Sequence, residues 1–177
     1  MSGSESGVDT GTEEIGAEEV PPQFDNLANV FADGVIGALG GFTGTAIMTV
    51  VLLVATSLGA FDTAAFGTVA MLIGVDALLP ASLIVPFGYL LFLGVGMTIW
   101  PLLFASVGRY LPGRTYAIRG LPYGFILWTG FVLPFYDGYS GAALAIYAVT
   151  TLIGHLGYGF ALGSVFDFFS MRSELMV

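Results

Sequence analysis

The stretch "GVIGALGGFTGT", residues 34–45, places small residues four apart inside an uncharged apolar segment. If the segment is helical, residues four apart share a face. The small residues then form two rows, one with Gly37, Gly41 and Thr45 and the other with Gly40 and Gly44. Small residues at this spacing let helix backbones approach closely, which is how helices associate in lipid. The stretch therefore predicts a membrane helix whose glycine rows meet other helices.

The composition of the whole chain also favours a membrane location. Of its 177 residues, 56% are hydrophobic and only 10% are charged. A soluble domain carries roughly 25% charged residues, so most of this chain is expected to face lipid or neighbouring helices. The net charge of −9, with only four basic residues, argues against nucleic-acid binding, which needs a basic surface.

The acidic residues gather near the N-terminus. Residues 1–33 hold eight of the 13 acidic residues and no basic one. Residues 1–22 are rich in Gly, Ser, Glu and Asp and predict a disordered acidic tail, without the features of a secretory signal. The apolar residues of 23–33 share one helical face. This segment predicts either an interfacial amphipathic helix or extra turns on the first span.

The chain contains neither cysteine nor lysine, because its four basic residues are all arginine. The absence of cysteine excludes disulfides, thiol chemistry and cysteine-ligated zinc or iron–sulfur sites within the chain. An acidic excess without lysine is typical of proteins from salt-loving archaea. We therefore expect a halophilic archaeal origin.

Four apolar segments predict membrane spans, because each approaches the length that a helix needs to cross roughly 30 Å of hydrocarbon. Their approximate bounds are 34–61, 82–108, 120–136 and 142–169. Together residues 34–177 would form a transmembrane helical bundle. The second span contains Pro86 and Pro101, and prolines usually kink membrane helices.

Residues 63–81 are the ambiguous segment of the chain. Their uncharged part, 63–75, would reach only about 20 Å as a helix, which is too short to cross. Asp76 and Pro80 follow it. The segment predicts a short re-entrant or interfacial helix, with a fifth span as the alternative. The fold class is thus an all-α, polytopic membrane protein with four transmembrane helices.

Basic residues predict the orientation of the spans. Three of the four arginines lie in the loop Arg109–Arg119, and Arg172 follows the last span. Because basic loops remain in the cytoplasm, this loop and the C-terminus are expected to be cytoplasmic in a multi-pass protein of the cell membrane. With four spans the acidic tail would also be cytoplasmic, and with five it would lie outside.

Two further pairs of glycines four residues apart lie at the start of the third span and within the fourth span. These predicted helix-packing residues are Gly120, Gly124, Gly159 and Gly163. The spacing predicts close helix contacts but leaves open whether the contacts lie within the chain, with a partner membrane protein or in a homo-oligomer.

His155 and Asp76 are the candidate functional residues. His155 is the only histidine and lies near the middle of the last span. A polar side chain at that depth must face protein or water, with Thr98, Thr129, Thr151 or a backbone carbonyl as a possible partner. Both residues are candidates for an ion pathway. The alternatives are a packed, structural His155 and an Asp76 that ends a short interfacial helix.

Familiar catalytic and metal-binding patterns are missing from the sequence. A second histidine, a Gly-x-Ser-x-Gly elbow, a phosphate-binding glycine loop and a metalloprotease helix are all absent. No catalytic residue, metal site or enzymatic activity is therefore predicted. A haem on His155 would need a second axial ligand, for which the candidates are Met48, Met71 and Met97. No cofactor is predicted, and His155 stays a candidate haem ligand only.

Three motifs carry a resemblance to a known group of proteins. They are "GVIGALGGFTGTAIMT" in the first span, "RGLPYGFILW" at the third and "HLGYGFALG" in the fourth. Over about residues 30–170 the chain resembles small four-helix integral membrane proteins of unknown function from halophilic archaea, some loosely named after cytochrome oxidase subunits. Relatives often carry a second histidine in the second span, and "FGYLLFLGVGMTIW" here has none. The resemblance implies a fold and a compartment, but no activity.

Together these observations predict a small structural or accessory membrane subunit that packs through glycine-rich helix faces, in contact with the lipid bilayer and a protein partner. The alternative is a small oligomeric transporter or channel that uses His155 and Asp76. A haem-bearing electron-transfer subunit is a third interpretation.

Overall fold

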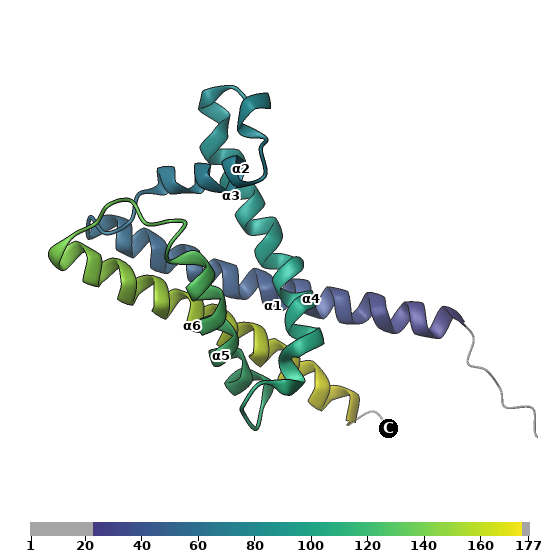
Figure 1. Ribbon diagram of the computed structural model, residues 1–177. Coiled ribbons are helices and arrows are strands. Elements are labelled where there is room, and N and C mark those ends of the chain that lie inside the picture. Colours follow the sequence, from purple (N-terminus) through teal and green to yellow (C-terminus); the bar gives the residue numbers. More distant parts are fainter. Residues whose placement is uncertain (1–22, 175–177) are drawn as a thin grey trace, which may run out of the picture.

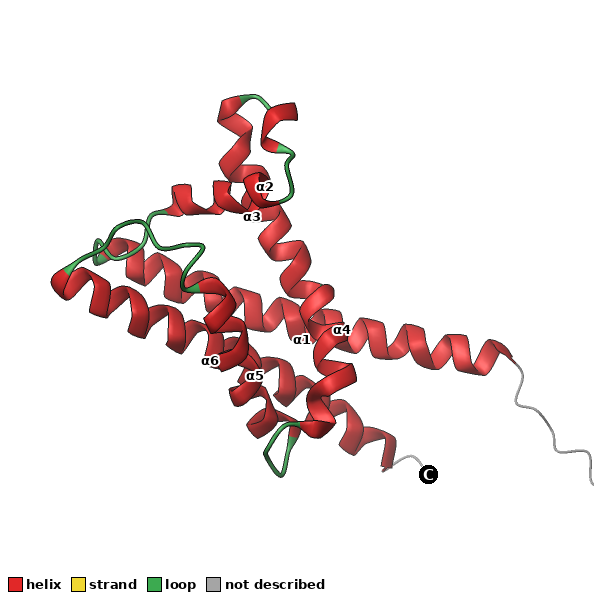
Figure 2. Cartoon of the chain, in the orientation of Figure 1, coloured by secondary structure: helices red, strands yellow, loops and turns green. Residues whose placement is uncertain are grey.

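The computed structural model describes residues 23–174, with side chains over 34–170. Over this range every regular element is a helix (Figure 2). The longer helices are α1 (Gln23–Ser57), α3 (Ala81–Met97), α4 (Ile99–Val107), α5 (Tyr116–Phe131) and α6 (Gly141–Glu174). The predicted acidic tail, 1–22, lies outside the described residues, and residues 23–33 form the first turns of α1 without a break.

Three helices are long and apolar enough to cross a membrane, which indicates a multi-pass membrane protein. They are Gly34–Ser57, Ala81–Tyr110 and Gly141–Ser170. The sequence predicted four such helices, and α5 is the one that is shorter, with 16 residues. It also begins at Tyr116 rather than at 120, so Arg119 is the fourth residue of the helix.

Four short elements complete the described chain: η1 (Thr63–Phe66), α2 (Gly67–Leu72), η2 (Asp76–Leu78) and η3 (Gly108–Tyr110). The first three occupy the segment that the sequence left ambiguous. Their longest continuous stretch, Thr63–Leu72, is a short apolar helix of about 15 Å. No helix of spanning length forms between α1 and α3, so the alternative of a fifth span finds no support in this described segment.

The helices run alternately up and down, so the α1–α3 and α5–α6 connections lie at one end of the bundle and the α4–α5 connection lies at the other. At one end the rings of Phe61, after α1, and Phe131, in the last turn of α5, stack with centroids 6.4 Å apart. At the other end Asp167, late in α6, contacts the first residues of α5. Figure 1 shows α1 and α6 side by side with α5 against α6, and α3 inclined away from them toward α2. The arginine-containing loop and the end of α6 therefore share one end of the molecule.

The first span ends earlier than predicted, at Ser57 rather than 61. Gly59 adopts a φ of +68°, a left-handed conformation that favours glycine and that commonly ends helices. The amide of Ala60 then donates to the carbonyl of Ala55 over 2.9 Å, which satisfies one of the last carbonyls of α1.

The second span is broken at Thr98, where α3 ends and α4 begins. Pro101 explains the break, because its ring lacks an N–H and clashes with the carbonyl four residues before it, that of Met97. Thr98 leaves the helical region, with φ −123° and ψ −65°. Pro86, by contrast, lies inside α3 without ending it. The predicted interruption of this span is therefore found near Pro101, where the helix breaks, but not at Pro86.

A carboxylate from the far end of α6 caps the N-terminus of α5. Asp167 accepts hydrogen bonds from the amides of Tyr116 and Ala117, both 2.8 Å long. A helix N-terminus leaves its first amides unpaired and carries a partial positive charge, so an ionised carboxylate stabilises it. Thr115 adds a side-chain cap on Ile118 over 3.3 Å. This contact between α5 and α6 holds the short helix in place.

Candidate functional site

His155 is almost completely buried, with 6% of its surface exposed. Its Nδ1 lies 2.8 Å from the backbone carbonyl oxygen of Thr151. A carbonyl oxygen only accepts hydrogen bonds, so in the neutral ring Nδ1 carries the proton and Nε2 is left as an acceptor. Among the described residues, the structure gives Nε2 no hydrogen-bond partner. Of the partners expected from the sequence, it is therefore a backbone carbonyl that holds this histidine.

The hydroxyl of Thr151 does not bond His155 but forms hydrogen bonds with Trp128 and Tyr147. It accepts from the indole N–H of Trp128 over 3.0 Å and donates to the carbonyl of Tyr147 over 2.7 Å. Trp128 thus connects α5 to α6. The bond from His155 Nδ1 to Thr151 O, which does not involve Trp128, fixes the orientation of the His155 ring.

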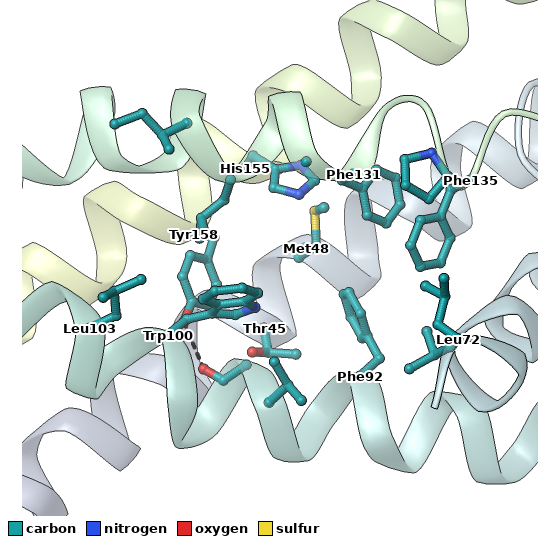
Figure 3. Close-up of a pocket in the computed structure, with 17 residues that line it drawn as sticks. Thr45, Met48, Leu72, Phe92, Trp100, Leu103, Phe131, Phe135, His155 and Tyr158 are labelled. Atoms are coloured by element: carbon teal, nitrogen blue, oxygen red, sulfur yellow. Dashed lines mark hydrogen bonds between the residues drawn. The ribbon is translucent and has the colours of Figure 1, made fainter. Parts of the chain in front are cut away.

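His155 lies at the wall of a cavity of about 440 Å³ between α3–α4 and α5 (Figure 3). We call this cavity the crevice. Its buried floor is formed by Thr45, Met48, His155 and Tyr158, each with at most 6% of its surface exposed. Its mouth is formed by the exposed side chains of Leu72, Leu103 and Ile126. The crevice therefore opens at the surface of the helices and narrows toward the histidine.

The crevice exists because α3 and α5 are held by different neighbours. α3 packs on α1, η1 and α2, whereas α5 packs on α6, and the two make no comparable contact with each other. Two tyrosine hydroxyls connect the halves near the break at Thr98. Tyr158 donates to the carbonyl of Gly96 over 2.7 Å, and Tyr123 donates to that of Trp100 over 2.6 Å. These bonds hold the two halves together at one end of the crevice, and the rest of the crevice stays open between them.

Aromatic rings form much of the crevice wall. The ring of Phe131 lies 4.8 Å from the imidazole of His155, centroid to centroid. Phe135 stacks on Phe131 at 4.0 Å, and Phe92 and Trp100 line the opposite side (Figure 3). The wall is therefore apolar and aromatic, with the histidine as its buried acceptor.

The eight predicted packing glycines lie between helices of this chain. On α1, Gly40 and Gly44 face Leu162 and Tyr158 of α6, whereas Gly37 and Gly41 face the α3–α4 junction at Pro101 and Gly96. Between α5 and α6, Gly120 meets Gly159, Gly124 meets the carbonyl of His155, and Gly163 meets that of Tyr116. A Cβ at most of these positions would collide with a neighbour. The glycine rows thus serve contacts inside the chain, and a protein partner or homo-oligomer stays a prediction.

The structure does not bring Asp76 and His155 into one cavity. Asp76 is the first residue of η2, and it is not among the residues that line the crevice. Of the candidate haem ligands, Met48 lines the crevice, but its sulfur packs on Gly154, and Met71 is 57% exposed. Over the described residues no group of three His, Asp or Glu side chains could hold a metal ion.

Sequence reasoning identified His155 but missed the crevice around it. Its walls come from all six α-helices of the described chain, so no spacing within one segment reveals them. Two signals were present in the sequence. Pro101 is placed to break the second span, and Trp100 beside it lies too far inside the span for a membrane-interface residue.

Residues 31–177 match a family described as "Family of unknown function (DUF6789)". The chain belongs to the DUF6789 family. This agrees with the predicted resemblance to a group of unknown function, whereas the halophilic origin and the names taken from cytochrome oxidase subunits stay predictions. No curated protein and no solved structure matches this DUF6789 chain. Its function must therefore be argued from its own geometry.

Proposed function

We propose that the chain is a four-span protein of the cell membrane that holds a lipophilic molecule inside the bilayer. The proposal has two parts, a topology and a binding role. The observation that carries it is the crevice, which is lined by residues from all three helices of spanning length and from the shorter α2 and α5.

The fourth span in this proposal is α5 with the turns that follow it. The amide of Val132 donates to the carbonyl of Trp128, and that of Phe135 to Phe131, which continues the helical bonding beyond the last residue of α5. A helix over 116–135 reaches about 30 Å, enough to cross the hydrocarbon core. The arginine loop would then be cytoplasmic, together with the N-terminal tail and the C-terminus.

The absence of cysteine makes this topology directly testable. Single cysteines at Ser4, Tyr110, Leu78 and Ser140 can be labelled with a membrane-impermeant maleimide in intact cells. We expect Leu78→Cys and Ser140→Cys to react, and Ser4→Cys and Tyr110→Cys to react only after lysis. Equal labelling at Tyr110 and Ser140 would show that α5 does not cross, and labelling of Ser4 in intact cells would require an odd number of spans.

The binding role follows from where the crevice opens. Leu103 and Ile126 lie within α4 and α5 and are 42% and 54% exposed, so in a membrane the mouth would face hydrocarbon rather than water. A volume of about 440 Å³ lies within the range of roughly 300–1,000 Å³ that is usual for small-molecule sites. A lipophilic molecule could enter from the bilayer without crossing a polar surface.

Quenching of Trp100 by a brominated probe tests this role. In a Trp128→Phe background the chain keeps one tryptophan, which lines the crevice. In nanodiscs, 1-bromododecane is expected to quench its fluorescence saturably. Gly130→Leu should abolish the saturable part, because Gly130 lines the crevice and a leucine there would extend into open space.

Gly94→Leu is the matched control for this experiment. Gly94 also lies in a helix with open space at its Cβ, but it is not among the crevice residues. In Gly94→Leu, 1-bromododecane should quench the fluorescence of Trp100 as saturably as it does in the protein with Gly94. Non-saturable quenching that both leucine variants share would reflect bulk lipid and would reject the binding role.

A further inference from the structure

We propose that the occupant of the crevice is a lipophilic phenol, an apolar molecule whose aromatic hydroxyl donates a hydrogen bond to Nε2 of His155. This inference rests on the proposed binding role and names the chemistry of the ligand. It is carried by a nitrogen of a buried histidine that has no hydrogen-bond partner among the described residues and that lies at the floor of an aromatic cavity.

The floor of the crevice accepts hydrogen bonds and has no side-chain hydrogen left to give. The proton on His155 Nδ1 goes to the carbonyl of Thr151, 2.8 Å away. The hydroxyl of Thr45 donates to Gly41 O, and that of Tyr158 donates to Gly96 O, both over 2.7 Å. A ligand at the floor must therefore bring the hydrogen itself. Carbonyl and ether ligands lack one.

Burial makes this unpaired nitrogen costly unless a ligand satisfies it. A buried acceptor without a partner loses the hydrogen bond that water would supply. His155 is 6% exposed, and it is one of the residues that line the crevice. A ligand that donates to Nε2 recovers this loss, so the hydrogen bond should contribute measurably to its affinity.

The wall favours an aromatic ring next to the hydroxyl. Phe131 lies 4.8 Å from the imidazole and Phe135 stacks on Phe131 at 4.0 Å. Phe92 and Trp100 face them across the crevice. Aromatic pairs gain energy beyond their buried area when stacked with an offset or edge to face. A phenol also has a more acidic hydroxyl than an alkyl alcohol, which makes it the better donor to an imidazole nitrogen.

A pair of probes that differ only in the donor tests the inference. In nanodiscs, 4-nonylphenol and its methyl ether, 4-nonylanisole, each compete with 1-bromododecane for the crevice of the full chain carrying Trp128→Phe. We expect the phenol to displace 1-bromododecane at about tenfold lower concentration, the effect of one satisfied buried hydrogen bond. The concentrations of both probes are compared at one lipid content, so that partition into the bilayer is corrected in the same way.

His155→Phe then tests which group receives the hydrogen bond. Phenylalanine has a comparable ring but no acceptor. In this variant the two probes should displace 1-bromododecane at the same concentration, which is the concentration of 4-nonylanisole that the His155 protein requires. A phenol preference that survives in His155→Phe would overturn the assignment. If that variant does not fold, equal displacement by the two probes in the His155 protein would overturn it without any variant. Absence of saturable 1-bromododecane quenching would instead reject the binding role itself.

Discussion

Gly159→Leu is expected to abolish most of the folded, monodisperse protein that can be recovered in detergent. The backbone of α5 at Gly120 lies directly against Gly159, so an added Cβ would collide with a main-chain carbonyl. A rotamer change cannot relieve a collision with backbone. The whole α5–α6 contact would have to separate, at a cost of about 3 kcal/mol or more, a large fraction of a typical stability of about 5–15 kcal/mol. Size-exclusion chromatography and thermal unfolding measure the loss.

Two other substitutions make this result specific. Gly94→Leu adds the same side chain to a helical glycine with open space at its Cβ and should leave the elution profile unchanged. His155→Ala removes a side chain without forcing helices apart and should cost less than Gly159→Leu. If Gly159→Leu is recovered as well as Gly94→Leu or His155→Ala, close backbone contact does not hold α5 to α6.

Gly41→Leu is expected to remove the crevice while leaving much of the bundle folded. A Cβ at Gly41 would meet the carbonyl of Gly96, and it would lie 2.6 Å from Pro101 Cγ and 2.8 Å from Met97 Cα. These atoms surround the break between α3 and α4, so the substitution would push that hairpin away from α1. The contact of α1 with α6 uses the other glycine row. We therefore expect a loss of about 1–3 kcal/mol in stability and complete loss of saturable Trp100 quenching.

Gly34→Leu supplies the control on the same helix. Gly34 lies in α1, and its Cβ would have nothing within 4 Å. Quenching and thermal unfolding should both match those of the parent protein. Full quenching in Gly41→Leu would mean that the α3–α4 hairpin does not depend on its approach to α1.

Composition and apolar length were enough to predict the helical class and three of the four expected helices of spanning length, whereas α5 is shorter. Hydrocarbon forces backbone polar groups to pair within each segment, so an apolar stretch of about 20 residues permits little besides a helix. The same reasoning placed the end of α1 too late in the sequence. Gly59, which has a positive φ, follows the end of the helix at Ser57, although apolar residues continue to Phe61. The reasoning also placed the start of α5 too late, because Asp167 caps residues that look like a loop in sequence.

The environment of His155 could be predicted only in part. Depth in the span required protein around the histidine, and a backbone carbonyl was one of the partners considered. The space beside it depends on α3 leaning away from α5, which in turn depends on the break at Thr98 and on two tyrosines from other helices. These are contacts between residues more than 20 positions apart, and no periodicity within one segment encodes them.

The carboxylate of Asp167 has a consequence for how the chain is made. A ribosome releases α5 about 50 residues before it releases the aspartate that binds its first amides. Until then the beginning of α5, which follows Arg109 and Arg114 and contains Arg119, lacks this partner. Helices α5 and α6 should therefore enter the bilayer as a hairpin rather than one after the other, and the start of the short helix should become stable only after Asp167 has left the ribosome.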